Sequence, residues 1–478
     1  MPNPEHVALL LSAEWNAWRA RNPNVTPDLT HAELAGQDLS EKDLKRADLS
    51  RADLTGTSLS AADLTRATLI EARLDGVSAP GAILENCLLD FLDLSKAFLA
   101  GARMRSASVE NCALVGTNFA GADLSRIRFD GSNLSEGNFA GANLSESSFR
   151  GVKTAGSHFD GADLSKAFFE GVSLTGVSFP NANFEGANLK SADLTGADLR
   201  RARFIRANLR QSALNAANCE GADFTEADLE LCQAVETDFS GANFDRTKMR
   251  KMALKRAIFL DASGEGVSFA DSRLLEVDLR TARFESASFQ NADLSKAILS
   301  RTNLKPYSFV GAKFANCDAS ESQAQGVNFS RADLSLGNFR LANLKRANLS
   351  ECRAFNADLS GTLLVGANFT DASLEEADLR FARAIGADFT RASLGGADLA
   401  NADLSEAMFK RTKVWGATAR RIKPPRGMGI VFSVSTMFHK AKEKKTKAVD
   451  VKQRQRTKRI AALEAEADAK PPHRTGRR

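Results

Sequence analysis

Residues 182–201 read ANFEG ANLKS ADLTG ADLRR, four groups of five in which each group repeats the plan of the one before. Every group has Ala in its first place, Asp or Asn in its second, and Leu or Phe in its third. Small, polar or charged residues hold the last two places. The chain is therefore built on a five-residue repeat, and a repeat of this kind decides the fold before any other feature does.

The same frame extends in both directions from this stretch. Every fifth residue from Leu29 to Val414 falls in the third place without a shift, and of these 78 positions 42 are Leu and 23 are Phe. The first place holds mostly Ala, and otherwise usually Ser, Thr, Val, Cys or Gly. This repeat explains why a chain of 478 residues contains 30 Phe and 33 Gly but a single Tyr.

The order small, polar, large within each group alternates with a period of two, which is typical of an extended segment with one buried face. The two polar residues that follow predict a corner. A helix is excluded because its buried residues recur at spacings of three and four, whereas a strict spacing of five would wind around its surface. Each group is therefore expected to form one short side and one turn.

This plan resembles that of the pentapeptide repeat family, whose motif is Ala-(Asp/Asn)-Leu-X-X, and the resemblance covers about residues 28–418. It implies an all-β solenoid, a right-handed quadrilateral β-helix in which four groups make one coil of 20 residues. The 78 groups then give about 19 to 20 coils, or on the order of 90 Å at ~4.8 Å per coil. Phe residues that recur at intervals of 20 favour the same period, and with Leu164 they are the predicted structural core: Phe184, Phe204, Phe224 and Phe244.

The two ends of the chain depart from the repeat. In residues 1–26, Asn3 and Pro4 can begin a helix whose apolar stripe includes Leu11 and Trp15, and we expect this capping helix to cover the first coil. Residues 27–418 form the predicted β-helix. Residues 419–478 are expected to form a C-terminal cap strand and a basic, partly disordered tail, because they contain 18 Lys and Arg against five Asp and Glu.

No arrangement of residues typical of an enzyme or a metal site is found. All six Cys fall in inward places and the five His are scattered, so we expect no catalytic residues, no metal and no cofactor. A continuous solenoid should leave a convex exterior without a pocket. The sequence has neither an export signal nor an apolar stretch long enough to span a membrane, which predicts a cytoplasmic protein.

Function is therefore expected at the surface. One apolar cluster should project from one side of three successive coils, and it is the candidate binding surface for an unknown protein partner or a second copy of the chain. Its members are Leu341, Leu363, Val365, Phe381 and Ile385. The tail is the candidate site for an anionic partner, and only there is nucleic acid expected to bind. Its selected residues are Arg420, Arg421, Lys423, Lys444, Lys445, Arg454, Arg456, Lys458 and Arg459.

Three functional hypotheses follow. The first is a non-enzymatic scaffold for protein interaction built on the rod. The second, implied by the resemblance, is a DNA mimic that binds the type II topoisomerase gyrase, although the family members with that role are shorter and more acidic than this chain. The third is tethering to nucleic acid through the basic tail.

Overall fold

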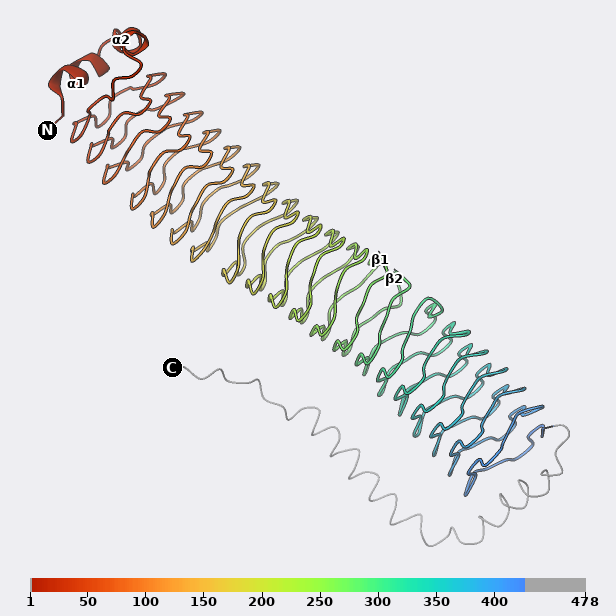
Figure 1. Ribbon diagram of the computed structural model, residues 1–478. Coiled ribbons are helices and arrows are strands. Elements are labelled where there is room, and N and C mark those ends of the chain that lie inside the picture. The colour runs from red at the N-terminus through yellow and green to blue at the C-terminus, as the bar shows by residue number, and fades with distance from the viewer. Residues whose placement is uncertain (1, 426–478) are drawn as a thin grey trace, which may run out of the picture.

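The computed structural model describes residues 2–425, which form one straight rod of stacked coils with two short helices at its N-terminal end (Figure 1). Parallel bridges connect residues that lie 20 apart, from Asp28↔Asp48 at the first coil to Asp403↔Lys423 at the last. Each coil therefore contains four five-residue sides. The predicted right-handed quadrilateral β-helix with a 20-residue period is confirmed.

The backbone of one group shows why five residues suffice for a side and a corner. In the group that contains Leu54, the Leu54 N–H donates to the Arg73 carbonyl in the next coil, and the Asp53 N–H donates to the Ala32 carbonyl in the previous coil. The Gly56 N–H donates to the Asp75 carbonyl, and the Thr57 N–H closes the corner onto the Leu54 carbonyl. Four of the five N–H groups thus have backbone partners.

The fifth N–H group explains the preference for Asp or Asn in the second place. It belongs to the first corner residue, and it donates to the carboxylate or amide oxygen of the residue two positions earlier. Thr65 donates in this way to Asp63 Oδ1 at 3.0 Å, and Ala140 donates to Asn138 Oδ1 at 3.0 Å. Such an acceptor satisfies a backbone donor that would otherwise depend on water.

The second corner residue takes a positive φ in almost every group, including many that are not Gly, such as Phe91 at 63° and Leu341 at 58°. A positive φ at the third residue of a turn closed by an i to i+3 bond defines a type II turn. Within residues 28–425, the exceptions are Thr281 and Pro306. The corner at Arg280 and Thr281 also lacks the closing bond of the regular coils, and the Thr281 hydroxyl instead accepts from the Asp261 N–H at 3.0 Å.

The third-place side chains fill the interior of the rod. Leu164, Phe184, Phe204, Phe224 and Phe244 are all fully buried. The Phe rings stack from coil to coil, with centroids 4.8 Å apart for Phe184 and Phe204 and 5.0 Å apart for Phe204 and Phe224, and their planes lie within 4°. The core is a continuous apolar column.

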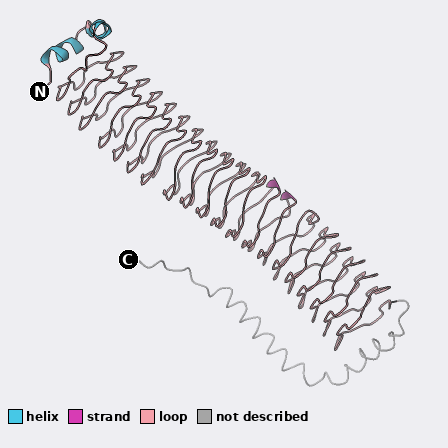
Figure 2. Cartoon of the chain, viewed as in Figure 1, coloured by secondary structure: helices cyan, strands magenta, loops and turns pink. Residues whose placement is uncertain are grey.

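Two three-residue strands mark an irregular place in this column (Figures 1 and 2). Strand β1, Ser263–Glu265, pairs in parallel with β2, Arg283–Glu285, and aligns Gly264 with Phe284. Gly264 has no side chain to fill its central place. The Phe284 ring lies 6.3 Å from Phe244, two coils away, and so occupies that space.

The N-terminal end is covered by two helices instead of the expected single one. Helix α1 is Pro4–Leu10, with Asn3 Oδ1 accepting from the Glu5 and His6 N–H groups, and α2 is Trp15–Arg21. The break turns Leu10 and Trp15 into the core, where both are fully buried, but leaves Leu11 half exposed. The expectation that Leu11 belongs to the buried stripe is therefore wrong, because that stripe assumed one unbroken helix.

The coils extend slightly beyond the expected boundary at residue 418. Lys423 still bridges to Asp403, and the Leu404 N–H donates to the Lys423 carbonyl at 2.8 Å. Residues 426–478, including most of the predicted cap strand and basic tail, lie outside the described part of the chain.

Candidate partner-binding surface

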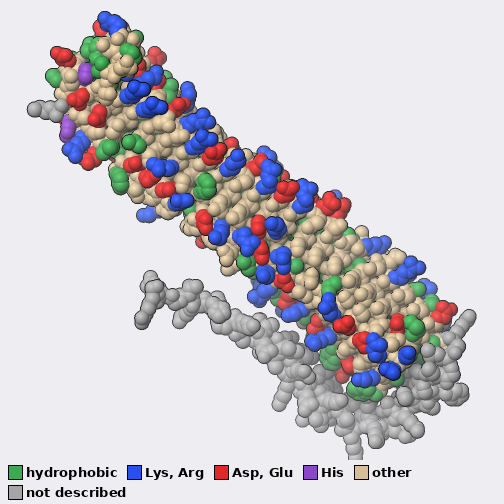
Figure 3. Space-filling model, viewed as in Figure 1, with side chains coloured by type: hydrophobic (Ala, Val, Ile, Leu, Met, Phe, Trp, Pro, Cys, Tyr) green, Lys and Arg blue, Asp and Glu red, His purple; other side chains and the backbone are tan. Residues whose placement is uncertain are grey.

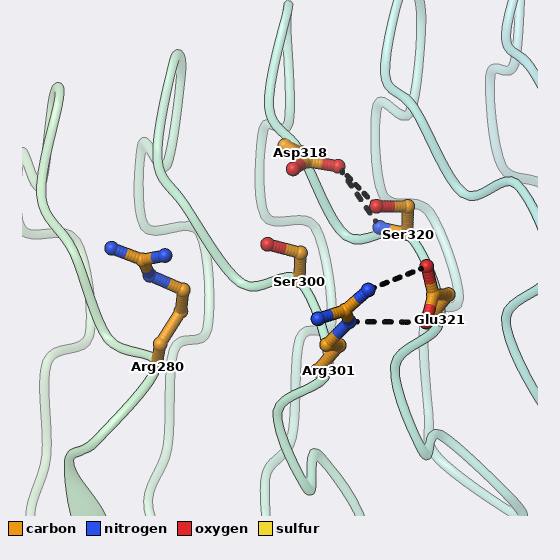
Figure 4. Close-up of a pocket in the computed structure, with 6 residues that line it drawn as sticks. All are labelled: Arg280, Ser300, Arg301, Asp318, Ser320 and Glu321. Atoms are coloured by element: carbon orange, nitrogen blue, oxygen red, sulfur yellow. Dashed lines mark hydrogen bonds and ion pairs between the residues drawn. The ribbon is translucent and has the colours of Figure 1, made fainter.

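One open depression of about 430 Å³ interrupts the exterior beside the irregular corner at Thr281 (Figure 4). Arg280, Ser300 and Ser320 follow one another at the same corner of three coils, and Ser300 is too small to fill the space between its neighbours. Arg301, Asp318 and Glu321 complete the lining. The expectation of a surface without any pocket is corrected here, because a small corner residue follows an irregular turn.

The charged groups of this depression are already paired. Arg280 Nη2 lies 2.6 Å from Asp278 Oδ2, and this hydrogen bond holds the pKa of the Asp278 carboxyl below its usual range. Arg301 donates through Nε to Glu321 at 3.0 Å, which raises the pKa of the guanidinium. No group of metal-ligating side chains occurs within residues 2–425. The depression therefore offers no unpaired charge for a ligand from these two arginines.

The six cysteines are buried, free thiols in the rod. Burial raises the pKa of Cys112 to about 11, although a backbone N–H from Leu92 opposes the change. Cys87 and Cys232 donate weakly to carbonyl oxygens 23 residues earlier, as Thr and Ser do in the same place. They behave as small core residues, not as reactive thiols.

The predicted apolar cluster, Leu341, Leu363, Val365, Phe381 and Ile385, lies on one side of the rod and its two bordering corners; we call it the apolar patch. Leu341 and Phe381 occupy one corner, two coils apart, and are 52% and 61% exposed. Leu363 lies in the adjacent side, where it bridges to Asn343 and Arg383. Val365 and Ile385 stand one coil apart at the other corner, both partly buried.

Gly361 separates Leu341 from Phe381 along their shared corner. A β-carbon at Gly361 would come within 2.7 Å of Leu341 Cδ2, so the Leu341 side chain leans over this glycine toward Phe381. Because Gly361 has no side chain, Leu341 and Phe381 can form one continuous apolar surface along this corner instead of two separate exposed residues. The patch spans two coil steps, or about 10 Å along the rod.

Four basic residues border the apolar patch; we call them the basic rim. They are Arg340, Lys345, Arg346 and Arg383. None of them makes an ion pair with any residue in the described part of the chain, and Arg340, Arg346 and Arg383 are exposed. The three segments that build this face, residues 340–346, 360–366 and 380–386, contain no Asp or Glu.

The basic rim was not singled out from the sequence. Its members are up to 43 positions apart in the chain, between Arg340 and Arg383, and the overall charge of the rod is mildly acidic. The signal was nevertheless present. Aligning the chain at a period of 20 and searching each side for the absence of carboxylates would have identified it.

Elsewhere on the rod, about half of the basic residues form ion pairs with carboxylates. Figure 3 shows acidic and basic side chains interspersed along the visible face. Many pairs connect one coil to the next, such as Arg246 with Glu226 at 2.8 Å, Arg256 with Glu276 at 2.8 Å, and Arg126 with Glu146 at 3.0 Å. The basic rim differs from these paired positions because the segments that carry it contain no Asp or Glu.

Three residues of the candidate anionic site are described. Lys423 Nζ lies 3.2 Å from Asp403 Oδ2, and Arg421 occupies the last corner with a positive φ of 55°. The Arg420 carbonyl accepts from the Asn401 N–H at 2.8 Å. These three residues therefore belong to the final coil. The other predicted members lie outside the described residues: Lys444, Lys445, Arg454, Arg456, Lys458 and Arg459.

The 20-residue coil, the type II corners and the stacked apolar column define a β-helical solenoid whose polar and charged side chains lie on its outer sides. Two family models match the chain. One, described as a pentapeptide repeat region, matches residues 102–179. A second, described as pentapeptide repeats (8 copies), matches residues 28–66, 67–105, 82–119, 192–230, 265–304, 308–346, 325–361, 355–391 and 387–422. Because these matches cover more than half of the chain, it belongs to the pentapeptide repeat family.

Solved structures of similar proteins include three members of this kind. HetL, a pentapeptide repeat protein involved in heterocyst differentiation regulation in Nostoc sp. strain PCC 7120, is 25% identical over 55% of this chain and 91% of its own, with a TM-score of 0.18. QnrB1, a plasmid-mediated fluoroquinolone resistance protein, is 18% identical over 51% and 90%, with a TM-score of 0.23. Rfr23 from Cyanothece 51142 is 20% identical over 32% and 89%, with a TM-score of 0.12. No curated protein sequence matches the chain significantly.

Helices α1 and α2 have seven residues each, and no helix between residues 2 and 425 has the length and apolar content needed to cross a bilayer.

Proposed function

We propose that this protein is a non-enzymatic scaffold that binds a partner protein through the apolar patch. The observation that carries this proposal is the pair Leu341 and Phe381, two large apolar side chains more than half exposed on one corner. Their exposure to water does not stabilise a monomer. Burying each side chain in an interface would contribute roughly 1.5 to 3 kcal/mol to the free energy of binding. Aromatic residues are also enriched at the centres of protein interfaces.

The test compares proteins that co-purify with the full chain and with a Leu341→Ser, Phe381→Ser double variant. A matched control is Ile258→Ser, Leu260→Ser, which removes two exposed apolar residues from another coil. We expect at least one protein to be lost with the patch variant and retained with the control. An identical set of proteins from all three chains would refute the proposal. Analytical ultracentrifugation of the same chains tests whether the partner is a second copy.

A DNA mimic that binds gyrase is the alternative, and the charge distribution gives it less support. Such a role needs a continuous acidic surface, but the carboxylates of Asp278 and Asp378 are each held by an arginine two residues later, at 2.6 Å. Inhibition of gyrase supercoiling by micromolar protein would favour this alternative. Unchanged supercoiling would remove it.

Tethering to nucleic acid through the tail is the other alternative. Replacing Lys444, Lys445, Arg454, Arg456, Lys458 and Arg459 by Gln in the full chain should then weaken binding to DNA or RNA and flatten its salt dependence. Binding that is unaffected by these changes would exclude the tail as the site.

A further inference from the structure

We propose that the chain's own segment 460–469 docks on the face formed by the apolar patch and the basic rim, and so competes with the external partner. This inference rests on the proposed function, because it names what occupies the same surface when no partner is bound.

The face is complementary to an occupant that carries both apolar groups and carboxylates. Arg340, Lys345, Arg346 and Arg383 surround the patch with positive charge that no described residue neutralises. Two nearby arginines are paired in contrast, because Arg380 binds Asp378 and Arg391 binds Asp371. Complementary charge favours an acidic occupant and fixes its register. A second copy of this face would instead bring eight like charges together.

Segment 460–469 has this composition. It reads IAALEAEADA, and its Glu464, Glu466 and Asp468 are three of the five acidic residues between 419 and 478. Ile460 and Leu463 are spaced three apart, and Glu464 and Asp468 four apart, which would place each pair on one side of a helix. Ala and Glu favour helix formation by their intrinsic propensity.

The connection between the two is long enough. The described rod ends at residue 425, and Phe381 lies about two coils before that end, or about 10 Å along the rod. Residues 426–459 provide 34 residues between the rod and the segment. A random coil of that length has an r.m.s. end-to-end distance of about 30 Å. Intramolecular docking on that scale corresponds to a millimolar effective concentration, so even a weak contact would be populated.

The test uses a fluorescein-labelled peptide of residues 460–469 and measures its binding by fluorescence anisotropy. One receptor is the wild-type full chain. The other is the full chain with Glu464→Lys, Glu466→Lys and Asp468→Lys, which removes the complementary charge of the internal segment. We expect the charge-reversed chain to bind the peptide at least tenfold more tightly than the wild type, because its face is vacant.

The location of the site is tested in the charge-reversed chain. Adding Phe381→Ser and Arg383→Ser should abolish peptide binding, whereas Phe355→Ser and Arg353→Ser, an exposed pair with the same spacing on another side of the rod, should leave it unchanged. Circular dichroism and thermal unfolding establish that each variant is folded.

Two results would overturn the inference. If the charge-reversed chain does not bind the peptide, the segment is not the occupant. If both chains bind the peptide equally well, the internal segment does not cover the face. Neither result refutes the proposed function, since the loss of a co-purifying protein with Leu341→Ser, Phe381→Ser is measured separately.

Discussion

At the scale of single residues, the three fixed places of the repeat each solve a different problem. The Leu or Phe side chain fills the interior of the rod. The small side chain leaves room for the neighbouring side of the coil. The Asp or Asn side chain accepts a hydrogen bond from the one corner N–H that has no backbone partner. Polar residues in the small place keep the same logic, because Thr57 Oγ1 donates to the Leu34 carbonyl inside the core at 2.8 Å. The motif therefore combines a local requirement at the corner with packing and hydrogen bonds to the coils on either side.

Replacing Phe204 by Ala should cost about 3 to 5 kcal/mol in the stability of its coil, because a fully buried ring between two stacked neighbours leaves a cavity. Phe204→Leu should cost less than about 1.5 kcal/mol, since Leu is common at equivalent places. Amide hydrogen exchange across residues 200–219 gives the free energy of opening. Equal losses for the two variants would contradict the cavity argument.

The Asp278 carboxylate should make the protein less stable as the pH falls below the usual range of a carboxyl pKa. The bond from Arg280 lowers the pKa of Asp278 in the folded state, so the carboxylate stabilises the fold above its unfolded pKa of ~3.9, and this stabilisation is lost as pH falls through the lower folded value. Asp278→Asn should therefore melt below the wild type at pH 7 and approach it near pH 2. Because the pair is partly exposed, the difference should be small.

The control for this prediction is Glu285→Gln, at an exposed carboxylate that forms no ion pair within residues 2–425. It replaces a carboxyl by an amide, as Asp278→Asn does, at a position where no arginine holds the carboxylate, and so measures the effect of the substitution itself. If the difference in melting temperature between Asp278→Asn and the wild type grew as the pH fell, the pH dependence would have the opposite sign. That result would refute the stabilising role of the Asp278 carboxylate.

At the scale of elements, the N-terminal helices act as a lid on the first coil. Trp15 is fully buried, and its indole N–H donates to the Asp43 carbonyl at 2.9 Å. Arg19 is almost fully buried and donates to the Lys45 and Val25 carbonyls at 2.9 and 2.8 Å. These bonds satisfy carbonyl groups at the open end of the solenoid, which would otherwise recruit another chain.

Trp15→Ala should remove this lid, with a local cost of about 3 to 5 kcal/mol. We expect faster amide exchange in residues 28–48 and concentration-dependent association of the exposed ends, measured by light scattering. Leu11→Ala is the matched control, because Leu11 is half exposed and should have little effect. Unchanged exchange in the first coil of the Trp15 variant would show that the helices are not a structural cap.

At the scale of the whole molecule, each coil touches only its neighbours, so stability accumulates along one dimension. Charge is distributed in the same way, with ion pairs such as Arg51 and Glu71 linking successive coils at the surface. Their side chains are 57% and 60% exposed, and pairs of this kind contribute little to stability. Burial in the column, and not the outer charge, holds the rod together.

Raising NaCl from 0.05 to 0.5 M should therefore change the melting temperature of the full chain by no more than a few degrees, since exposed pairs are individually weak and readily screened. Differential scanning calorimetry at the two salt concentrations measures this. A large fall in melting temperature would mean that the surface ion pairs carry the stability. Peptide binding at the basic rim, in contrast, should weaken strongly over the same range.

The five-residue period, the coil of 20 residues and the core residues could all be predicted from the sequence, because the motif recurs without a shift and Phe residues return at intervals of 20. Which side chains meet at the surface could not be predicted in this way. The break between α1 and α2, the depression beside Thr281 and the basic rim around Phe381 all depend on side chains 20 or more positions apart. Contacts at that distance follow from the stacking of coils, and no local rule of the motif specifies them.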